Sequence, residues 1–124
     1  MRNQPEHCEQ VILMQRVALD HRTNRLLLTA VPNGGQRHPA VAGKLKAEGV
    51  KRGVPDILVF EWAPDGKGGM FCGLAIEMKI KPNKPTPEQV GWMEALTRRG
   101  WSCVVAYSAD EAWAALTAYI QVTP

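Results

Sequence analysis

The sequence predicts an α/β fold in a single domain spanning residues 1–124. Short apolar runs typical of β-strands alternate with segments whose apolar residues recur at helical spacing. Clusters of glycine, proline and asparagine separate these segments. The length is enough for one domain with its own apolar core, and the chain contains no internal repeat, low-complexity tract or linker.

The N-terminal part is predicted to contain two helices and one strand. Apolar residues at helical spacing predict the first helix over about residues 5–20. Leu26–Val31 is a strand-like run that ends in a turn at residues 32–35. Pro39–Glu48 is a short helix, because proline suits the first helical turn and Gly49 suits a helix end.

Two further strands are predicted in the middle of the chain. Residues 57–60 and 74–76 are apolar, and the segment 63–69 between them is dense in turn residues. A hairpin or meander would place Asp56, before the first run, and Glu77, after the second, at the same end of adjacent strands. We therefore expect the two carboxylates to converge at an edge of the sheet.

The C-terminal part is predicted to be a helix, a strand and a helix. The first helix runs from Pro87 to Arg99, with Thr86 as its N-cap and Gly100 after its end. Residues 102–106 form the strand, and about residues 109–121 form the last helix. The whole order is α-β-α-β-β-α-β-α.

Asp56 and the triplet Glu77-Met78-Lys79 carry the most informative chemistry. In an extended chain Glu77 and Lys79 lie on one face, while Met78 points to the other. Carboxylates are ligands for hard cations such as Mg²⁺ and Mn²⁺, and a lysine beside such an ion can orient water or stabilise charge on a phosphate. The pattern indicates metal-dependent hydrolysis of phosphodiesters.

A plainer interpretation of the same residues stays open. Asp56 could cap a turn at Pro55, and Glu77 and Lys79 could form a surface pair on an edge strand, since an acid two residues before a lysine is a common pattern. The position and burial of these side chains distinguish the two interpretations.

Five motifs together carry a resemblance to a known family. They are Gly53-Val54-Pro55-Asp56, Ile76-Glu77-Met78-Lys79, Thr86-Pro87-Glu88-Gln89, Val31-Pro32-Asn33-Gly34-Gly35 and Lys44-Leu45-Lys46-Ala47-Glu48-Gly49-Val50. In this combination the chain resembles the VRR-NUC family, the virus-type replication and repair nucleases of the PD-(D/E)xK nuclease superfamily. The resemblance extends from about Glu6 to the last helix.

The resemblance implies a restriction-endonuclease-like core, in which helices flank a mixed β-sheet. It implies a Mg²⁺- or Mn²⁺-dependent DNA endonuclease that acts on branched or structured DNA, with stand-alone phage-type members associated with homodimers and Holliday-junction cleavage. Asp56 and Glu77 would then bind the metal, with the backbone carbonyl of Met78 completing the site, and Lys79 would act in catalysis.

Three auxiliary residues follow from the same resemblance. A glutamate of the first helix in such nucleases reaches the metal, which makes Glu6 and Glu9 candidate ligands. Glu6 is preferred for its spacing to Gln10, although an acid in the first turn also suits the helix dipole. Gln89 would face the active site and hold the phosphate or water, although with Thr86 it also completes a capping box.

The charge distribution agrees with a DNA-binding enzyme. The chain has 15 Lys and Arg against 12 Asp and Glu. Basic residues bracket the predicted metal site and would attract phosphates, although a solvated basic face is the alternative. The predicted DNA-binding residues are Asn33, Arg37, Lys44, Lys51, Arg52, Lys81 and Lys84.

The other reactive residue types indicate no further site. Cys8, Cys72 and Cys103 are odd in number and widely spaced, so neither a disulfide framework nor a zinc site is predicted. The three histidines show no paired spacing. No signal or membrane span is recognised, and we expect the protein in the bacterial or phage-infected host cytosol.

Tryptophans near the C-terminus have two interpretations. Trp92, Trp101 and Trp113 lie near apolar residues, which favours packing of helices on the sheet. Stacking on exposed bases is the alternative. Apolar patches left after the core is filled could form a homodimer interface.

Two other functions remain compatible with the sequence. A restriction-type endonuclease that cuts plain duplex would use the same catalytic residues, although the chain has little room for a recognition region. A non-catalytic nucleic-acid-binding module would bind DNA equally well without metal.

Overall fold

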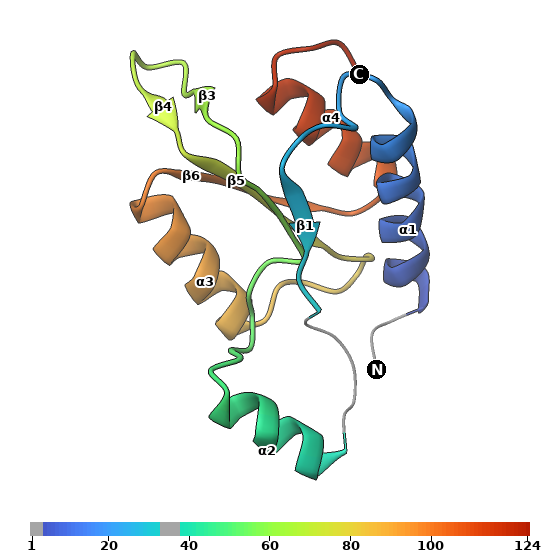
Figure 1. Cartoon of the computed structure of the whole chain (residues 1–124), viewed down its shortest axis with the longest axis vertical. Helices are drawn as coiled ribbons and strands as arrows, with labels where there is room; N and C mark the ends of the chain where they lie inside the picture. The colour runs from blue at the N-terminus through green and yellow to red at the C-terminus, as the bar shows by residue number, and fades with distance from the viewer. Residues whose placement is uncertain (1–3, 33–37) are drawn as a thin grey trace.

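The computed structural model describes residues 4–32 and 38–124 (Figure 1). Its elements follow the order expected from the sequence, with one additional pair of short strands. They are α1 (Gln4–Leu19), β1 (Leu28–Ala30), α2 (Pro39–Ala47), β2 (Ile57–Val59), β3 (Ala63–Pro64), β4 (Met70–Phe71), β5 (Gly73–Met78), α3 (Pro87–Arg98), β6 (Trp101–Ala106) and α4 (Ala109–Tyr119).

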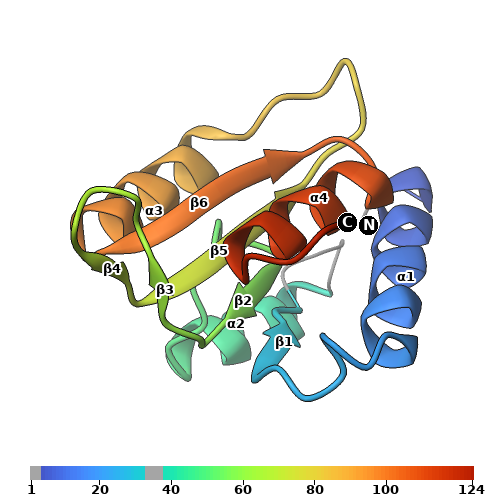
Figure 2. The same cartoon turned by 90° about the horizontal axis from the view of Figure 1, so that it is seen from above.

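A mixed sheet forms the centre of the described residues. Its strand order is β1-β2-β5-β6, in which β2 is antiparallel to both neighbours and β6 is parallel to β5. Helices α1 and α4 pack together on one face of the sheet, and α3 covers β6 on the other face (Figure 2). The predicted α/β fold with a mixed, helix-flanked sheet is therefore confirmed.

The apolar core lies between the sheet and the pair α1 and α4. Side chains alternate along a strand, so Leu74, Ile76 and Met78 all point into this core, where Leu13 and Trp113 cover them. Each of these residues is almost completely buried, which stabilises the fold by roughly 1.5–3 kcal/mol per side chain. The alternation turns Ala75 and Glu77 to the opposite face.

The hairpin β3–β4 is the main element that the sequence did not predict. Residues 63–69 were expected to be turn only, but Ala63 and Pro64 pair with Phe71 and Met70. Asp65 closes the hairpin, because its Oδ1 accepts hydrogen bonds from the backbone N–H groups of Lys67 and Gly69.

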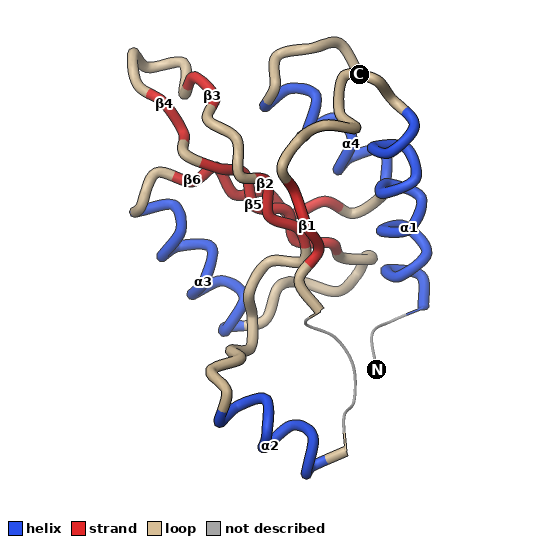
Figure 3. Tube along the Cα trace, viewed as in Figure 1, coloured by secondary structure: helices blue, strands red, loops and turns tan. Residues whose placement is uncertain are grey.

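Helix α2 stands away from the sheet (Figure 3). It contains no buried residue. The side chain of His38 caps its start by accepting from the N–H of Ala40, and Gly49 follows its end with a φ of 98°. The predicted helix is present, but it packs little against the rest of the described chain.

Gly53 fixes the approach of the segment before β2 to helix α3. Its φ is 91°, and a Cβ there would lie 2.6 Å from the carbonyl carbon of Glu88 and 2.9 Å from the amide nitrogen of Gln89. Only glycine meets both conditions without strain. This contact sets where the chain enters β2.

Replacing Gly53 by alanine should lower the free energy of unfolding by about 2 kcal/mol or more, since the change adds a backbone clash to the cost of positive φ. Gly66→Ala is the matched control, because Gly66 also has positive φ but a Cβ there meets nothing within 4 Å. That control should cost only about 1 kcal/mol. Urea unfolding measures both, and equal losses would contradict the close approach.

Candidate active site

Asp56 and Glu77 lie opposite each other at the ends of two neighbouring strands. Ile57 pairs with Ile76 in the antiparallel register of β2 and β5, so the next pair along is Asp56 and Glu77. Their exposed fractions are 4% and 1%. The convergence expected from the sequence is present at the same end of two adjacent strands, and these are the two inner strands of the sheet.

Backbone and lysine contacts hold this carboxylate pair. Oδ2 of Asp56 accepts a hydrogen bond of 2.7 Å from the backbone N–H of Met78. Nζ of Lys79 lies 3.8 Å from Oε2 of Glu77, and the Lys79 residue is only 9% exposed. The interpretation as a surface pair on an edge strand therefore does not apply to Glu77 and Lys79.

The carboxyl group of Glu77 resists ionisation, because it is buried beside a second carboxylate. Burial, followed by the neighbouring charge of Asp56, raises the pKa of Glu77 from 4.5 to about 9, although Lys79 acts in the opposite sense. Glu6 adds a smaller effect in the raising direction. Oε1 of Glu77 is buried, and within residues 4–32 and 38–124 it has no hydrogen-bond partner. A bound cation would offset the repulsion between the ionised carboxylates of Asp56 and Glu77, and it would give Oε1 of Glu77 a partner.

The oxygen atoms of Asp56 and Glu77 are suitable ligands for a hard divalent cation. Carboxylate oxygens suit Mg²⁺ and Mn²⁺, which keep several waters and use one or two carboxylates. Within residues 4–32 and 38–124, no three His, Cys, Asp or Glu side chains are grouped closely enough to hold an ion. Water and substrate oxygens would therefore complete the coordination.

The two glutamates of α1 have different surroundings. Glu6 is 9% exposed and lies close enough to Glu77 to raise its pKa. Oε1 of Glu9 instead accepts a 2.8 Å hydrogen bond from the backbone N–H of Ala109, the first residue of α4. Glu6 thus belongs to the surroundings of the acidic pair, whereas Glu9 connects two helices.

Gln89 takes part in the capping box that the sequence predicts. Its Oε1 accepts a 2.8 Å hydrogen bond from the N–H of Thr86, and its own N–H donates to the Thr86 hydroxyl at 3.2 Å. Its backbone also lies against Gly53, three residues before Asp56. The capping role is therefore present, and a catalytic role for this side chain stays a prediction.

Four of the predicted DNA-binding residues flank the acidic pair. Lys51 and Arg52 precede Asp56, whereas Lys81 and Lys84 follow Lys79, and all four are exposed. Because β2 starts where β5 ends, both segments leave the same end of the sheet.

The remaining predicted DNA contacts lie elsewhere or are not described. Lys44 is exposed on α2, which stands apart from the sheet. Asn33 and Arg37 lie outside the described residues.

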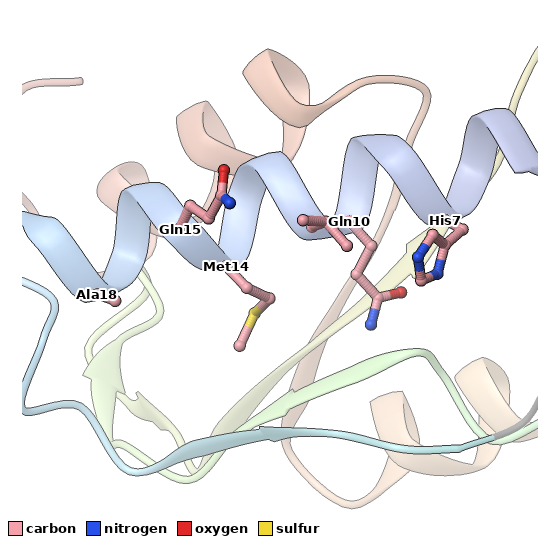
Figure 4. Close-up of a pocket in the computed structure, with 6 residues that line it drawn as sticks. His7, Gln10, Met14, Gln15 and Ala18 are labelled. Carbon is pink, nitrogen blue, oxygen red and sulfur yellow. The ribbon is translucent and has the colours of Figure 1, made fainter.

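A separate pocket of about 350 Å³ lies along α1 (Figure 4), and the described residues that line it include no carboxylate. His7, Gln10 and Met14 extend from the same side of the helix, whereas Gln15 points away from them. The pocket is therefore distinct from the acidic pair. No helix in the described part of the chain is long and apolar enough to cross a membrane.

The fold and the buried acid and lysine cluster together define a nuclease-type domain. The family model for the VRR-NUC domain matches residues 4–110, so the chain belongs to the VRR-NUC family. A solved structure described as a VRR_NUC domain protein has a TM-score of 0.78 and 25% sequence identity, covering 98% of this chain and 93% of that one. No curated protein matches the chain. At this level the protein is a nuclease whose substrate is DNA.

Two features around the site were not recognised from the sequence. The positioning role of Gly53 depends on a contact with α3 that is remote in the chain. Trp92 was interpreted as core, but it is only half-buried and lines a groove on α3. The signal that could have revealed this groove is the helical spacing of Glu88, Trp92 and Arg99 along one stripe.

Glu77→Gln should stabilise the folded chain at neutral pH when no metal is present. The folded-state pKa of about 9 lies above the ordinary value of 4.5, so the unfolded chain loses a proton that the folded chain keeps. Stability therefore falls as pH rises between these values, by at most about 1.4 kcal/mol per pH unit.

Urea unfolding in EDTA from pH 4.5 to pH 8 measures the effect. The glutamine variant should be more stable by more than about 1 kcal/mol at pH 7, and the gain should shrink towards pH 4.5. A gain that grows on acidification would contradict the assigned charge state.

Proposed function

We propose that the protein is a Mg²⁺- or Mn²⁺-dependent endonuclease that hydrolyses phosphodiester bonds in branched or structured DNA, with Holliday junctions among its substrates. The observation that carries the proposal is the buried pair of Asp56 and Glu77 with Lys79 beside it. Burial of two carboxyl groups in this arrangement opposes ionisation of Glu77 and so costs stability at neutral pH, which is characteristic of groups retained for chemistry.

Each side chain has a role in this mechanism. Asp56 and Glu77 would hold the ion, with the carbonyl of Met78 as a further ligand. When bound, the metal supplies an activated water and neutralises charge on the phosphate. Lys79 orients the attacking water or stabilises the charge that develops on the phosphate oxygens.

The exposed basic residues would hold the DNA backbone at both sides of the site. Lys51 and Arg52 lie in the segment before β2, and Lys81 and Lys84 lie in the segment after β5. Such contacts position the duplex but do not read its sequence. Selection of substrates would therefore rest on DNA shape, which favours junctions over a defined base sequence.

A homodimer is part of the proposal. Helix α2 contributes no buried residue, and Val41 on it is 50% exposed. An apolar helix face of this kind is suited to cover by a second copy. A two-fold dimer would present two active sites to a substrate with two strands to cut.

Asp56→Asn and Lys79→Ala should each lower the cleavage rate by at least about 100-fold, because they remove a metal ligand and a charge-stabilising group. Asp110→Asn is the control, since Asp110 is an exposed acid on α4 with a side chain 95% accessible. It should keep the wild-type rate.

The assay compares four-way junctions, flaps and plain duplex, each with Mg²⁺, with Mn²⁺ and with EDTA. Metal-dependent cutting of branched DNA supports the proposal. Cutting of plain duplex at one sequence would indicate a restriction-type enzyme instead. Binding of DNA that is unaffected by EDTA and by Asp56→Asn, without cleavage of any substrate, would indicate a non-catalytic binding module.

Glu6→Gln and Glu9→Gln should separate metal binding from helix packing. Glu6 lies near Glu77, so its loss should raise the Mg²⁺ concentration needed for half-maximal cleavage. Glu9→Gln should lower the free energy of unfolding by about 1 kcal/mol, because a charged acceptor at the start of α4 becomes neutral, and should leave the Mg²⁺ requirement unchanged. An unchanged requirement in Glu6→Gln would remove Glu6 from the metal site.

A further inference from the structure

A groove of about 540 Å³ lies along helix α3, outside the acidic cluster. In Figure 2 this helix is on the opposite side of the sheet from α1 and α4. The residues that matter for its chemistry are Arg52, Glu88, Trp92, Ala95, Leu96 and Arg99.

The floor of the groove is apolar and only partly covered. Trp92, Ala95 and Leu96 are half-buried, and α3 contains no fully buried residue. Gly91 also lines the groove, and a Cβ at this position would meet nothing within 4 Å. The groove therefore has free space next to the indole ring of Trp92.

Cationic side chains lie towards the two ends of the groove. Arg52 is in the segment that packs on the start of α3, and Arg99 caps the C-terminal end of that helix. No ion pair within the described residues involves either arginine, and Arg99 uses Nη1 to donate to the carbonyl of Ala95. The start and end of α3 are about 16 Å apart. Glu88 is the opposing charge at the Arg52 end.

The groove begins beside the chain segment that leads to the candidate active site. The contact of Gly53 with the backbone of Glu88 and Gln89 fixes Arg52 at the start of the groove, and the same segment leads directly to Asp56. A DNA strand that leaves the acidic cluster past Arg52 would therefore reach the end of the groove that Arg52 lines.

We propose that this groove binds an unpaired, single-stranded arm of the DNA substrate, with one base stacked on Trp92 and the flanking phosphates at Arg52 and Arg99. The proposal rests on the proposed function as a DNA nuclease. An aromatic ring between cations is the arrangement that holds single strands, because an unpaired base offers its face for stacking. In a duplex that face is covered by neighbouring bases.

The test measures binding of the full-length chain in EDTA, so that no cleavage occurs. Fluorescence anisotropy gives Kd for a blunt duplex and for the same duplex with a single-stranded oligothymidine arm. Wild-type protein should bind the armed DNA about tenfold more tightly, as expected for stacking of one base. Equal Kd values for the two DNAs would overturn the proposal.

Gly91→Glu is the main variant, because it places a carboxylate in the groove at a position with room for a side chain. It should abolish the preference for armed DNA and leave the Kd for blunt duplex within about twofold. Ala114→Glu is the matched control, as Ala114 is exposed on α4, on the other face of the sheet. An equal loss of preference in the control, or none in Gly91→Glu, would overturn the proposal.

Trp92 supplies a second comparison. Trp92→Ala should reduce the preference for armed DNA over blunt duplex by about tenfold, whereas Trp92→Phe should keep most of this preference. Thermal melting checks that both variants fold. If Gly91→Glu changes self-association in sedimentation and leaves armed-DNA binding intact, the groove is a protein interface and the proposal fails. Because these measurements need no metal, they stay separable from a failure of the cleavage assay.

Discussion

The pairing of β2 with β5 is the constraint on which the rest of the site depends. Its register places Asp56 directly opposite Glu77, inside the protein and at the ends of two inner strands. The core contacts of Ile76 and Met78 on the other face of β5 hold this register, because a slip of β5 by one residue would turn both apolar side chains out of the core and Glu77 into it.

The arrangement stores unfavourable electrostatic energy. Two carboxyl groups share a buried space, and one of them has a pKa raised to about 9 and an oxygen that lacks a hydrogen-bond partner among the described residues. The N–H of Met78 and the ammonium group of Lys79 offset part of this cost. A fold optimised for stability alone would not keep such a cluster. Buried groups that cost stability in this way are expected at functional sites.

Much of this organisation follows from local rules that can be applied to the sequence. The capping box at Thr86 and the glycines after α2 and α3 act within a few residues of the chain, so the helix bounds were predicted closely. The strand period alone placed Glu77 and Lys79 on one face and Met78 on the other. The family resemblance supplied the mixed sheet and the nuclease activity.

The features that were missed depend on contacts between distant segments. The position of the acidic pair on inner strands requires the parallel pairing of β6 with β5, which no local pattern encodes. The hairpin β3–β4 has strands of two residues each, too short for any periodicity. The separate environments of Glu6 and Glu9 follow from how α1 meets α4, and the partial exposure of Trp92 follows from how α3 meets the sheet.

Direct titration of metal tests the central claim most closely. Isothermal calorimetry with Mn²⁺ at pH 7 should show binding to wild-type protein that disappears in Asp56→Asn. Binding should also release a proton, seen as an enthalpy that depends on the buffer, because the carboxyl group of Glu77 must ionise to become a ligand. Absence of binding to the wild type, or binding that persists in Asp56→Asn, would contradict the assignment of these carboxylates as the metal site.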